Sequence, residues 1–218
     1  MAVSGSDNIV QLTSNPADEG AEELTERILA AAKLEFELIG IRRSSMGDVA
    51  RRAGIARATL YRRFPGKDNL VQAVATRELL TVMSRLVACL SLTNSGEDTV
   101  VQLAVASARE LRTNPLLNRL LTTEPEELYH YAANSGGPAL EVARGFLLQY
   151  LQPMHDLRLV PEQQLSRAAE IMIRLAVTQL LIPDGVVPFH DDYEMSLFAR
   201  QFLAPMVATN SSDGTHTT

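Results

Sequence analysis

The sequence predicts an all-α protein with a three-helix N-terminal domain followed by a larger helical C-terminal domain. Leu, Ala, Arg and Glu recur at helical spacing along its 218 residues, and alternating runs of β-branched residues are absent from the sequence. A hydrophobic content of 46% is sufficient to build a core. Short breaks rich in Gly, Pro, Asn and Ser separate the helical segments from one another.

The first predicted helix covers residues 22–39 and ends at Gly40. Its apolar residues fall on one stripe, formed by Leu24, Ile28, Ala32, Phe36 and Ile39. A second, short helix begins after Ser45. Asp48 stands three residues later, and the pair resembles a capping box with Asp in place of the usual Glu.

A glycine-containing turn and a third helix follow directly. Gly54 follows the last residue of the second helix, where the backbone is often left-handed and glycine adopts that conformation without steric cost. Residues 57–64 form the third helix, with Leu60 and Phe64 on its buried side and Pro65-Gly66 at its end. This order predicts a helix-turn-helix whose second helix enters the major groove of DNA.

Positive charge is concentrated in this segment of an otherwise acidic chain. Residues 41–67 contain eight basic residues and one acidic residue, whereas the whole chain has 20 basic and 26 acidic residues. A solvated charged face explains most charge runs. The coincidence with the helix-turn-helix pattern instead favours a single anion-binding surface.

The third helix has room for few contacts with DNA bases. An arginine can hold guanine through two hydrogen bonds, and a side-chain methyl group can touch a thymine methyl. We therefore expect base contacts from Arg57, Ala58, Thr59 and Arg62. Phosphate contacts, which position the protein on the duplex, are expected from Arg43, Ser45, Tyr61, Arg63 and Lys67.

Residues 24–70 resemble the DNA-binding domain of the TetR family of transcriptional regulators. The matching features are the run LAAAKLEF with Gly40, the segment 45–50, Ala53-Gly54-Ile55, Thr59-Leu60-Tyr61, Phe64 and the segment 67–70. Ala56 departs from the family pattern, which usually has serine before the recognition helix. That departure removes a helix cap and one expected phosphate contact.

The resemblance implies a dimeric bacterial regulator, most often a repressor, whose partners are double-stranded operator DNA and a small-molecule ligand. It further implies that a long helix beginning near Lys67 links the two domains. Ligand binding would move this helix and change the separation of the two recognition helices. Such a ligand acts only through its different affinities for the two states.

We divide the chain into a disordered arm (1–20), the helix-turn-helix domain (21–66), a ligand-binding and dimerisation domain (67–208) and a disordered tail (209–218). The predicted helices of the larger domain cover 67–92, 97–113, 115–121, 123–134, 138–157, 161–182 and 190–206, with a loop at 183–188. Pro153 is expected to kink or end its helix. Glu124, Glu126 and Glu127 are expected to be ordinary charges near a helix N-terminus.

The helices predicted at 138–157 and 161–182 are apolar on all sides. A helix of this kind must be covered on every side, and two such helices are too many for the interior of one subunit of this size. We therefore expect a symmetric homodimer in which this pair packs on its twofold mate as a four-helix bundle, as the resemblance also implies. The alternative is a buried hairpin within a monomer.

The larger domain is expected to hold an apolar ligand between its helices. Small-molecule pockets are mostly apolar with a few placed polar groups. The candidate lining residues, each of which also fits an ordinary core position, are Met83, Val87, Leu90, Leu103, Ala106, Leu117, Leu120, Tyr129, Phe146, Tyr150, Met172 and Leu175. Because the chain has no Trp and 5% aromatic residues, a flexible aliphatic ligand such as a fatty acid is favoured over a planar drug.

The sequence lacks the usual signs of catalysis and metal binding. The four histidines (His130, His155, His190 and His216) have no metal-ligand spacing, and phosphate-loop and nucleophile-elbow motifs are absent. We therefore predict no metal, no cofactor and no enzymatic activity. The alternative is a lipid or small-molecule carrier, or an enzyme, whose helix-turn-helix no longer reads DNA.

The cellular compartment is predicted from what the sequence lacks. The first twenty residues do not resemble a signal peptide, and no apolar run reaches the ~18 residues of a membrane span. Cys89 is the only cysteine and lies in an apolar run, so we expect a buried, unreactive thiol. These features predict a cytoplasmic protein that does not bind membranes.

Overall fold

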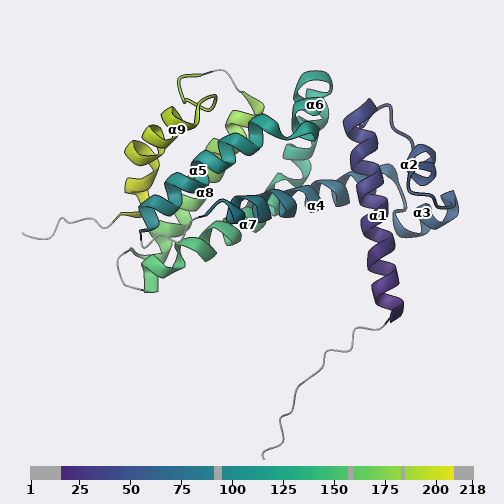
Figure 1. Ribbon diagram of the computed structural model, residues 1–218, viewed down its shortest axis with the longest axis horizontal. Helices are drawn as coiled ribbons and strands as arrows, with labels where there is room; N and C mark the ends of the chain where they lie inside the picture. Colours follow the sequence, from purple (N-terminus) through teal and green to yellow (C-terminus); the bar gives the residue numbers. More distant parts are fainter. Residues whose placement is uncertain (1–15, 91–94, 157–159, 183–184, 209–218) are drawn as a thin grey trace, which may run out of the picture.

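The computed structural model describes residues 16–90, 95–156, 160–182 and 185–208, and the prediction of an all-α fold is confirmed for these residues (Figure 1). The α-helices are α1 (Pro16–Ile39), α2 (Met46–Arg52), α3 (Arg57–Arg63), α4 (Lys67–Ala88), α5 (Gly96–Thr113), α6 (Pro115–Thr123), α7 (Pro125–Asp156), α8 (Glu162–Leu181) and α9 (Asp192–Phe198). A π-helical turn (Ala199–Leu203) and a 3-10 turn (Ala204–Val207) follow α9.

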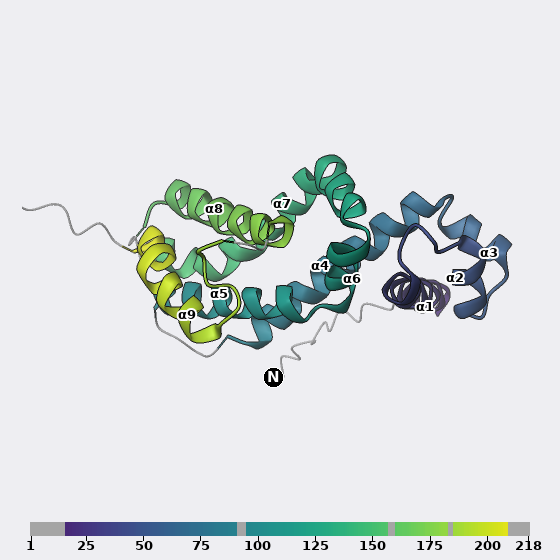
Figure 2. The ribbon, with the colours of Figure 1, turned by 90° about the horizontal axis from the view of Figure 1, so that it is seen from above.

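The molecule is elongated, with α1–α3 at one end and α5, α8 and α9 towards the other (Figures 1 and 2). Helix α4 starts beside α3 and runs into the second group of helices, so it links the two units. Helices α7 and α8 lie side by side along the second unit.

The core of the N-terminal unit is formed mainly by apolar side chains of α1–α4. Phe36, Val49, Leu60 and Leu70 are almost fully buried within it. The cluster also includes Leu116 and Leu120 of α6, and we call the whole set the N-terminal cluster. Helix α6 thus lies in the C-terminal part of the sequence but packs into the core of the helix-turn-helix unit.

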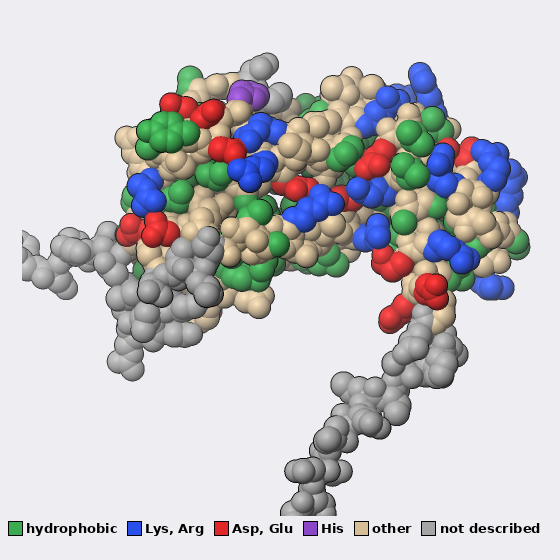
Figure 3. Space-filling model, viewed as in Figure 1, with side chains coloured by type: hydrophobic (Ala, Val, Ile, Leu, Met, Phe, Trp, Pro, Cys, Tyr) green, Lys and Arg blue, Asp and Glu red, His purple; other side chains and the backbone are tan. Residues whose placement is uncertain are grey.

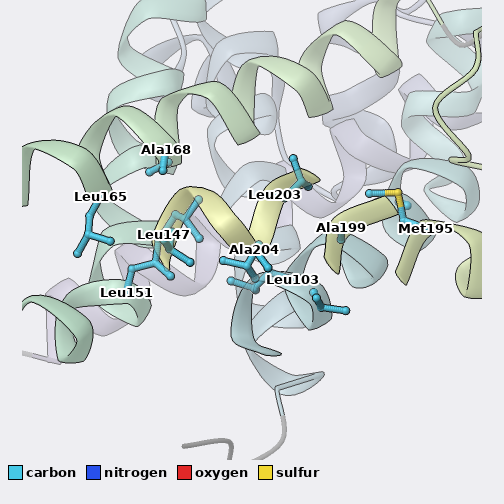
Figure 4. Close-up of a cluster of buried hydrophobic side chains, with 14 of the residues drawn as sticks. Leu103, Leu147, Leu151, Leu165, Ala168, Met195, Ala199, Leu203 and Ala204 are labelled. Carbon is cyan, nitrogen blue, oxygen red and sulfur yellow. The ribbon is translucent and has the colours of Figure 1, made fainter. Parts of the chain in front are cut away.

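The C-terminal unit has its own core, formed where α5, α7 and α8 meet the segment that follows α9 (Figure 4). Leu151 and Leu165 are fully buried there, and Ala168, Ala199 and Ala204 allow the helices to approach closely. Burying one leucine side chain of this kind contributes about 1.5–3 kcal/mol to folding.

Helix α7 corrects the prediction of two separate helices at 123–134 and 138–157. It runs without a break from Pro125 to Asp156, through Gly136 and Gly137 and past Pro153. Glycine inside a helix costs only about 1 kcal/mol relative to alanine. Burial of Leu128, Leu147 and Leu151 along α7 outweighs that cost.

Other boundaries also differ from prediction. Helix α1 begins at Pro16 rather than 22, so residues 16–20 of the expected arm are helical, whereas 1–15 and the tail at 209–218 lie outside the described residues. Helix α4 ends at Ala88 rather than 92. The helix expected over 190–206 is not α-helical throughout. After Phe198 it widens into the π-helical turn and then tightens into the 3-10 turn.

Cys89 is exposed, which corrects the prediction of a buried thiol. The residue is the C-cap of α4, and its N–H donates to carbonyls of the last turn. The helix therefore ends within the apolar run that contains Cys89, and the thiol is left at the surface.

Candidate nucleic-acid interface

Helices α2 and α3 adopt the predicted helix-turn-helix. Ser45 caps α2: its hydroxyl oxygen accepts the N–H of Asp48 at 3.1 Å and its O–H donates to the Asp48 carboxylate. Gly54 has φ +66°, so the left-handed turn expected there is present. The N–H of Ile55 donates to the carbonyl of Ala50 at 3.0 Å and closes the turn.

Helix α3 buries one side chain and exposes most of the others. Leu60 is fully buried, whereas Arg57, Ala58, Tyr61, Arg62 and Arg63 are exposed and Thr59 is half-buried. Basic side chains gather over the end of the molecule that α2 and α3 form (Figure 3). The residues predicted to meet DNA bases are therefore on the surface of one short helix.

The N-cap of α3 is Ala56, and its side chain makes no hydrogen bond to the helix. A serine or aspartate at such a position typically stabilises a helix by about 1 kcal/mol. The departure from the family pattern therefore has the local consequence expected from the sequence. The first turn of α3 is held by packing rather than by a side-chain cap.

Arg57 lies across the start of α2. A Cβ atom added to Gly47 would be 2.3 Å from Nη2 of Arg57 and 2.6 Å from its Cζ, so any larger residue at 47 would displace the guanidinium. The guanidinium is the far end of a flexible side chain, so Arg57 can swing away from Gly47 without a change in how the two helices pack.

Asp48 and Arg51 form an ion pair on the exposed side of α2, with 2.6 Å between Oδ1 and Nη2. The hydrogen bond from Ser45 and then the pairing with Arg51 hold the pKa of Asp48 below its usual range. The one acidic residue of the basic segment is therefore ionised and already paired.

Two of the predicted phosphate ligands are engaged by the protein itself. Nε of Arg63 donates to the hydroxyl of Thr25 at 2.8 Å, and its Nη2 donates to the carbonyl of Ala21 at 3.1 Å. Nζ of Lys67 donates to the carbonyl of Arg42 at 3.2 Å. Arg43 and Ser45 are exposed beside them in the loop before α2.

A buried carboxylate fixes α2 against α1. Glu35 is 5% exposed, and its Oε2 lies 2.6 Å from Nε of Arg52. Removing one partner of such a buried pair leaves an uncompensated charge. This pair was not among the sequence-derived candidates, although Arg52 belongs to the basic segment.

Glu124 connects the C-terminal unit to the loop between α1 and α2, which corrects its interpretation as an ordinary helix-terminal charge. The side chain is 6% exposed. Its Oε2 accepts the N–H of Ile41 at 2.7 Å and that of Arg42 at 3.3 Å. Arg42 also pairs with Glu126 of α7. The local sequence does not reveal this contact, because its two ends are far apart along the chain.

The residues predicted to line the ligand site differ in burial and in the core to which they belong. Leu103 is buried in the C-terminal core, and Leu90, Met172 and Leu175 pack against that core. Met83 and Ala106 are buried, and Val87 and Leu117 are half-buried. Leu120 lies instead in the N-terminal cluster.

The aromatic members of that set lie on α7. The rings of Phe146 and Tyr150 have centroids 5.2 Å apart and are tilted by 56°. Tyr129 is half-exposed, and its hydroxyl donates to the carbonyl of Leu181 at 3.2 Å.

Ala106 lines a hollow of about 250 Å³ beside the end of α4. The other lining residues are Cys89, Val101, Gln102, Val105 and Arg109. Ligand pockets usually measure about 300–1,000 Å³, so a drug-sized ligand would require the helices around this hollow to move apart. The polar lining residues Gln102 and Arg109 were not among the predicted ligand contacts, because α5 was expected to contribute apolar residues.

The described residues contain no group of three or more His, Cys, Asp or Glu side chains placed to hold a metal ion. None of the helices they form is both long and apolar enough to span a membrane.

The fold and this surface define a two-unit helix-turn-helix protein. Residues 28–74 match the family model described as bacterial regulatory proteins, tetR family. Over 121 residues the chain is 27% identical to an uncharacterized HTH-type transcriptional regulator of Mycobacterium tuberculosis, covering 56% of this chain and 59% of that protein. It is 26% identical over 185 residues to the HTH-type transcriptional regulator TtgR of Pseudomonas putida, covering 77% and 85% of the two chains.

Solved structures give the same assignment of the fold. The TetR family repressor AlkX from Dietzia sp. superposes with a TM-score of 0.65 at 21% identity, over 83% of this chain and 93% of AlkX. GusR of Salmonella enterica superposes with a TM-score of 0.62 at 16% identity, over 90% and 99%. The match to the family model is confined to the helix-turn-helix segment, and the solved structures show that the fold of this chain is similar to that of TetR family proteins. Both relatives are named as HTH-type transcriptional regulators, as the sequence prediction expects for this chain.

Proposed function

We propose that this protein is a dimeric, ligand-responsive regulator that binds operator DNA through α3 and acts as a repressor. The observation that carries the proposal is the exposed cationic surface of α2 and α3 on an otherwise acidic chain (Figure 3). Proteins of this type hold phosphates with basic side chains and read sequence through base edges in the major groove.

The proposed division of contacts follows from exposure and from existing bonds. The side chains that would face bases lie on the outer side of α3. They are the exposed Arg57, Ala58 and Arg62 and the half-buried Thr59. Phosphate contacts would come from Arg43, Ser45 and Tyr61, and from Arg63 and Lys67 once DNA competes with their present partners. Lys67 starts α4, where the helix dipole also favours an anion.

The test is recovery and sequencing of DNA fragments that bind the full-length protein, followed by titration of one fragment at increasing salt. Real phosphate contacts make the affinity fall steeply with ionic strength. Enrichment of one palindromic site with a steep salt dependence is the expected result. Absence of an enriched sequence would favour the carrier or enzyme alternative.

The proposed dimer uses α7 and α8. Val142 of α7 and Ile171 and Val177 of α8 are each 42–51% exposed in the single chain. A Cβ added to Gly145 of α7 would meet nothing within 4 Å, so this face is open to a partner. Pairing the two helices with their twofold mates would bury these side chains in a four-helix bundle.

The proposed effector is a small apolar, fatty-acid-like molecule bound between α4, α5, α7 and α8. Support comes from the aliphatic side chains gathered around Leu103 and from the hollow beside Ala106. Since α4 joins both units, a ligand that separates α4 from α5 would also move the recognition helix. The ligand would release DNA in proportion to its preference for the moved state.

A further inference from the structure

A second and larger hollow, of about 600 Å³, lies between the α1–α2 loop and the end of α6. One side is formed by Arg42 and Arg43 from the loop between α1 and α2. The other side is formed by Arg119, Thr123 and Glu124, at the end of α6 and before α7. Its volume falls in the range of small-molecule sites.

Two of the charged side chains at this hollow already have partners. Arg42 pairs with Glu126, and the Glu124 carboxylate accepts two backbone N–H groups of the α1–α2 loop. In contrast, neither Arg43 nor Arg119 has an ion-pair partner in the part of the chain that the structure describes. Two unpaired guanidinium groups therefore line the hollow, one from the α1–α2 loop and one from α6.

Arg119 also carries an unsatisfied donor. Its Nε is buried and has no hydrogen-bond partner among the described residues. An unmet buried donor is costly, and native proteins contain few of them. A guanidinium fork matches carboxylate and phosphate oxygens in geometry as well as in charge.

We propose that this hollow binds a small anion with carboxylate or phosphate groups, held between Arg43 and Arg119. A ligand in this position would touch the α1–α2 loop and α6, so it would favour the arrangement in which the two arginines are close together. The site is distinct from the apolar site proposed around Leu103, because none of its lining residues belongs to the C-terminal core.

The anion would also act on DNA binding, a consequence that rests on the proposed function. Arg43 is one of the proposed phosphate contacts. Its single positive charge cannot fully compensate both a bound anion and a DNA phosphate at the same time. The anion would therefore weaken DNA binding, and DNA would weaken anion binding by the same factor.

Anion binding is tested without DNA, by calorimetric titration of the full-length protein with inorganic phosphate and, separately, with citrate at constant ionic strength. We expect saturable binding of at least one of the two probes. Arg119→Gln should weaken it at least tenfold, about 1.4 kcal/mol, and Arg119→Lys should weaken it less. Arg200→Gln, at an exposed arginine paired with Asp98, is the matched control and should leave binding unchanged.

Lack of saturable binding of both probes, or equal binding by the wild type and Arg119→Gln, would overturn the proposal. Thermal melts check that each variant is folded. If Arg119→Gln does not fold, Arg43→Gln supplies the same comparison from the opposite side of the hollow.

A second experiment separates a free anion from the DNA backbone as the occupant. Adding the bound probe to the protein–DNA complex at fixed ionic strength should weaken DNA binding by the wild type but not by Arg119→Gln. If Arg119→Gln instead weakens DNA binding with no probe present, the hollow receives a DNA phosphate and the small-anion site is overturned. If the protein binds no DNA, the proposed function fails and the calorimetric result still decides the anion site.

Discussion

The carboxylate of Glu124 lies against the backbone of Gly40, at the place where a side chain on residue 40 would begin. A Cβ added to Gly40 would be 2.3 Å from Oε1 of Glu124, and the backbone φ at this glycine is +93°. The same carboxylate accepts the N–H of Ile41. The start of α7 is therefore fastened to the α1–α2 loop at a point that accommodates only glycine.

Gly40→Ala should destabilise the protein more than Gly54→Ala. Both glycines have positive φ, which costs about 1–2 kcal/mol for other residues. A Cβ on Gly54 meets nothing within 4 Å, whereas one on Gly40 would displace Glu124 and leave the Ile41 N–H unsatisfied, at a further cost of about 1–3 kcal/mol. Urea unfolding of the two variants measures the difference, and equal midpoints would contradict this account.

Arg62→Ala should weaken binding to the specific operator by about 1–3 kcal/mol and relax the preference at one base-pair position of each half-site. Lys67→Ala should weaken binding to all sequences about equally and reduce the salt slope by about one. Anisotropy titrations on the operator and on its single-base variants distinguish the two. A uniform loss in Arg62→Ala would place Arg62 among the phosphate contacts.

Ile171→Glu should convert the proposed dimer into a monomer. Ile171 is 51% exposed in the single chain, so a charge there disturbs no monomer core, but in the proposed bundle it would be buried without a partner. Leu197→Glu is a matched control, since Leu197 is 46% exposed on α9. Light scattering gives the masses; a dimeric Ile171→Glu would place the interface elsewhere.

Ala106→Trp should abolish the response to a fatty acid by filling the hollow of about 250 Å³ beside α4. Operator affinity without ligand should stay within about tenfold, or 1.4 kcal/mol, because α5 is remote from α3. Overpacking costs about 1–3 kcal/mol, so a thermal melt accompanies the assay. Ala133→Trp, at an exposed site on α7, serves as control. A folded Ala106→Trp that the fatty acid still releases from DNA would exclude this ligand site.

Asp192→Asn should lower stability at neutral pH and have little effect in acid. Hydrogen bonds from Arg109 and then Arg112 hold the pKa of Asp192 below its usual 3.8. The folded-state pKa is thus lower than the unfolded one. The stabilisation is complete above about 3.8 and is lost as the pH falls through the folded value. Thermal melts of both proteins down to about pH 3 measure this, and a difference independent of pH would contradict it.

Local signals in the sequence predicted the helix-turn-helix well. Ser45 with Asp48 marked the start of α2, and Gly54 marked the turn, because capping and left-handed backbone depend on residues close in the chain. The missing side-chain cap at Ala56 was likewise predicted. The residues expected to contact bases are on the surface of α3, although their contacts with DNA remain predictions.

Contacts between distant segments could not be predicted in this way. The two glycines at 136 and 137 suggested a break, but packing along α8 keeps α7 continuous. The burial of Glu124 depends on a loop more than eighty residues earlier. Arg63 was expected to be free for phosphate, whereas its bonds to α1 follow from how the helices cross.

The packing of α6 into the N-terminal cluster limits how the DNA-reading part can be exchanged between relatives. A chimera that joined residues 21–66 to another member's C-terminal unit would lose Leu116 and Leu120 from its core. Loss of each buried leucine typically costs about 2–5 kcal/mol, which is comparable with the whole stability of a small domain. If α3 reads operator DNA as proposed, substitutions confined to its surface should transfer operator specificity, whereas a cut at the end of the motif should destabilise the hybrid unless α6 is transferred with it.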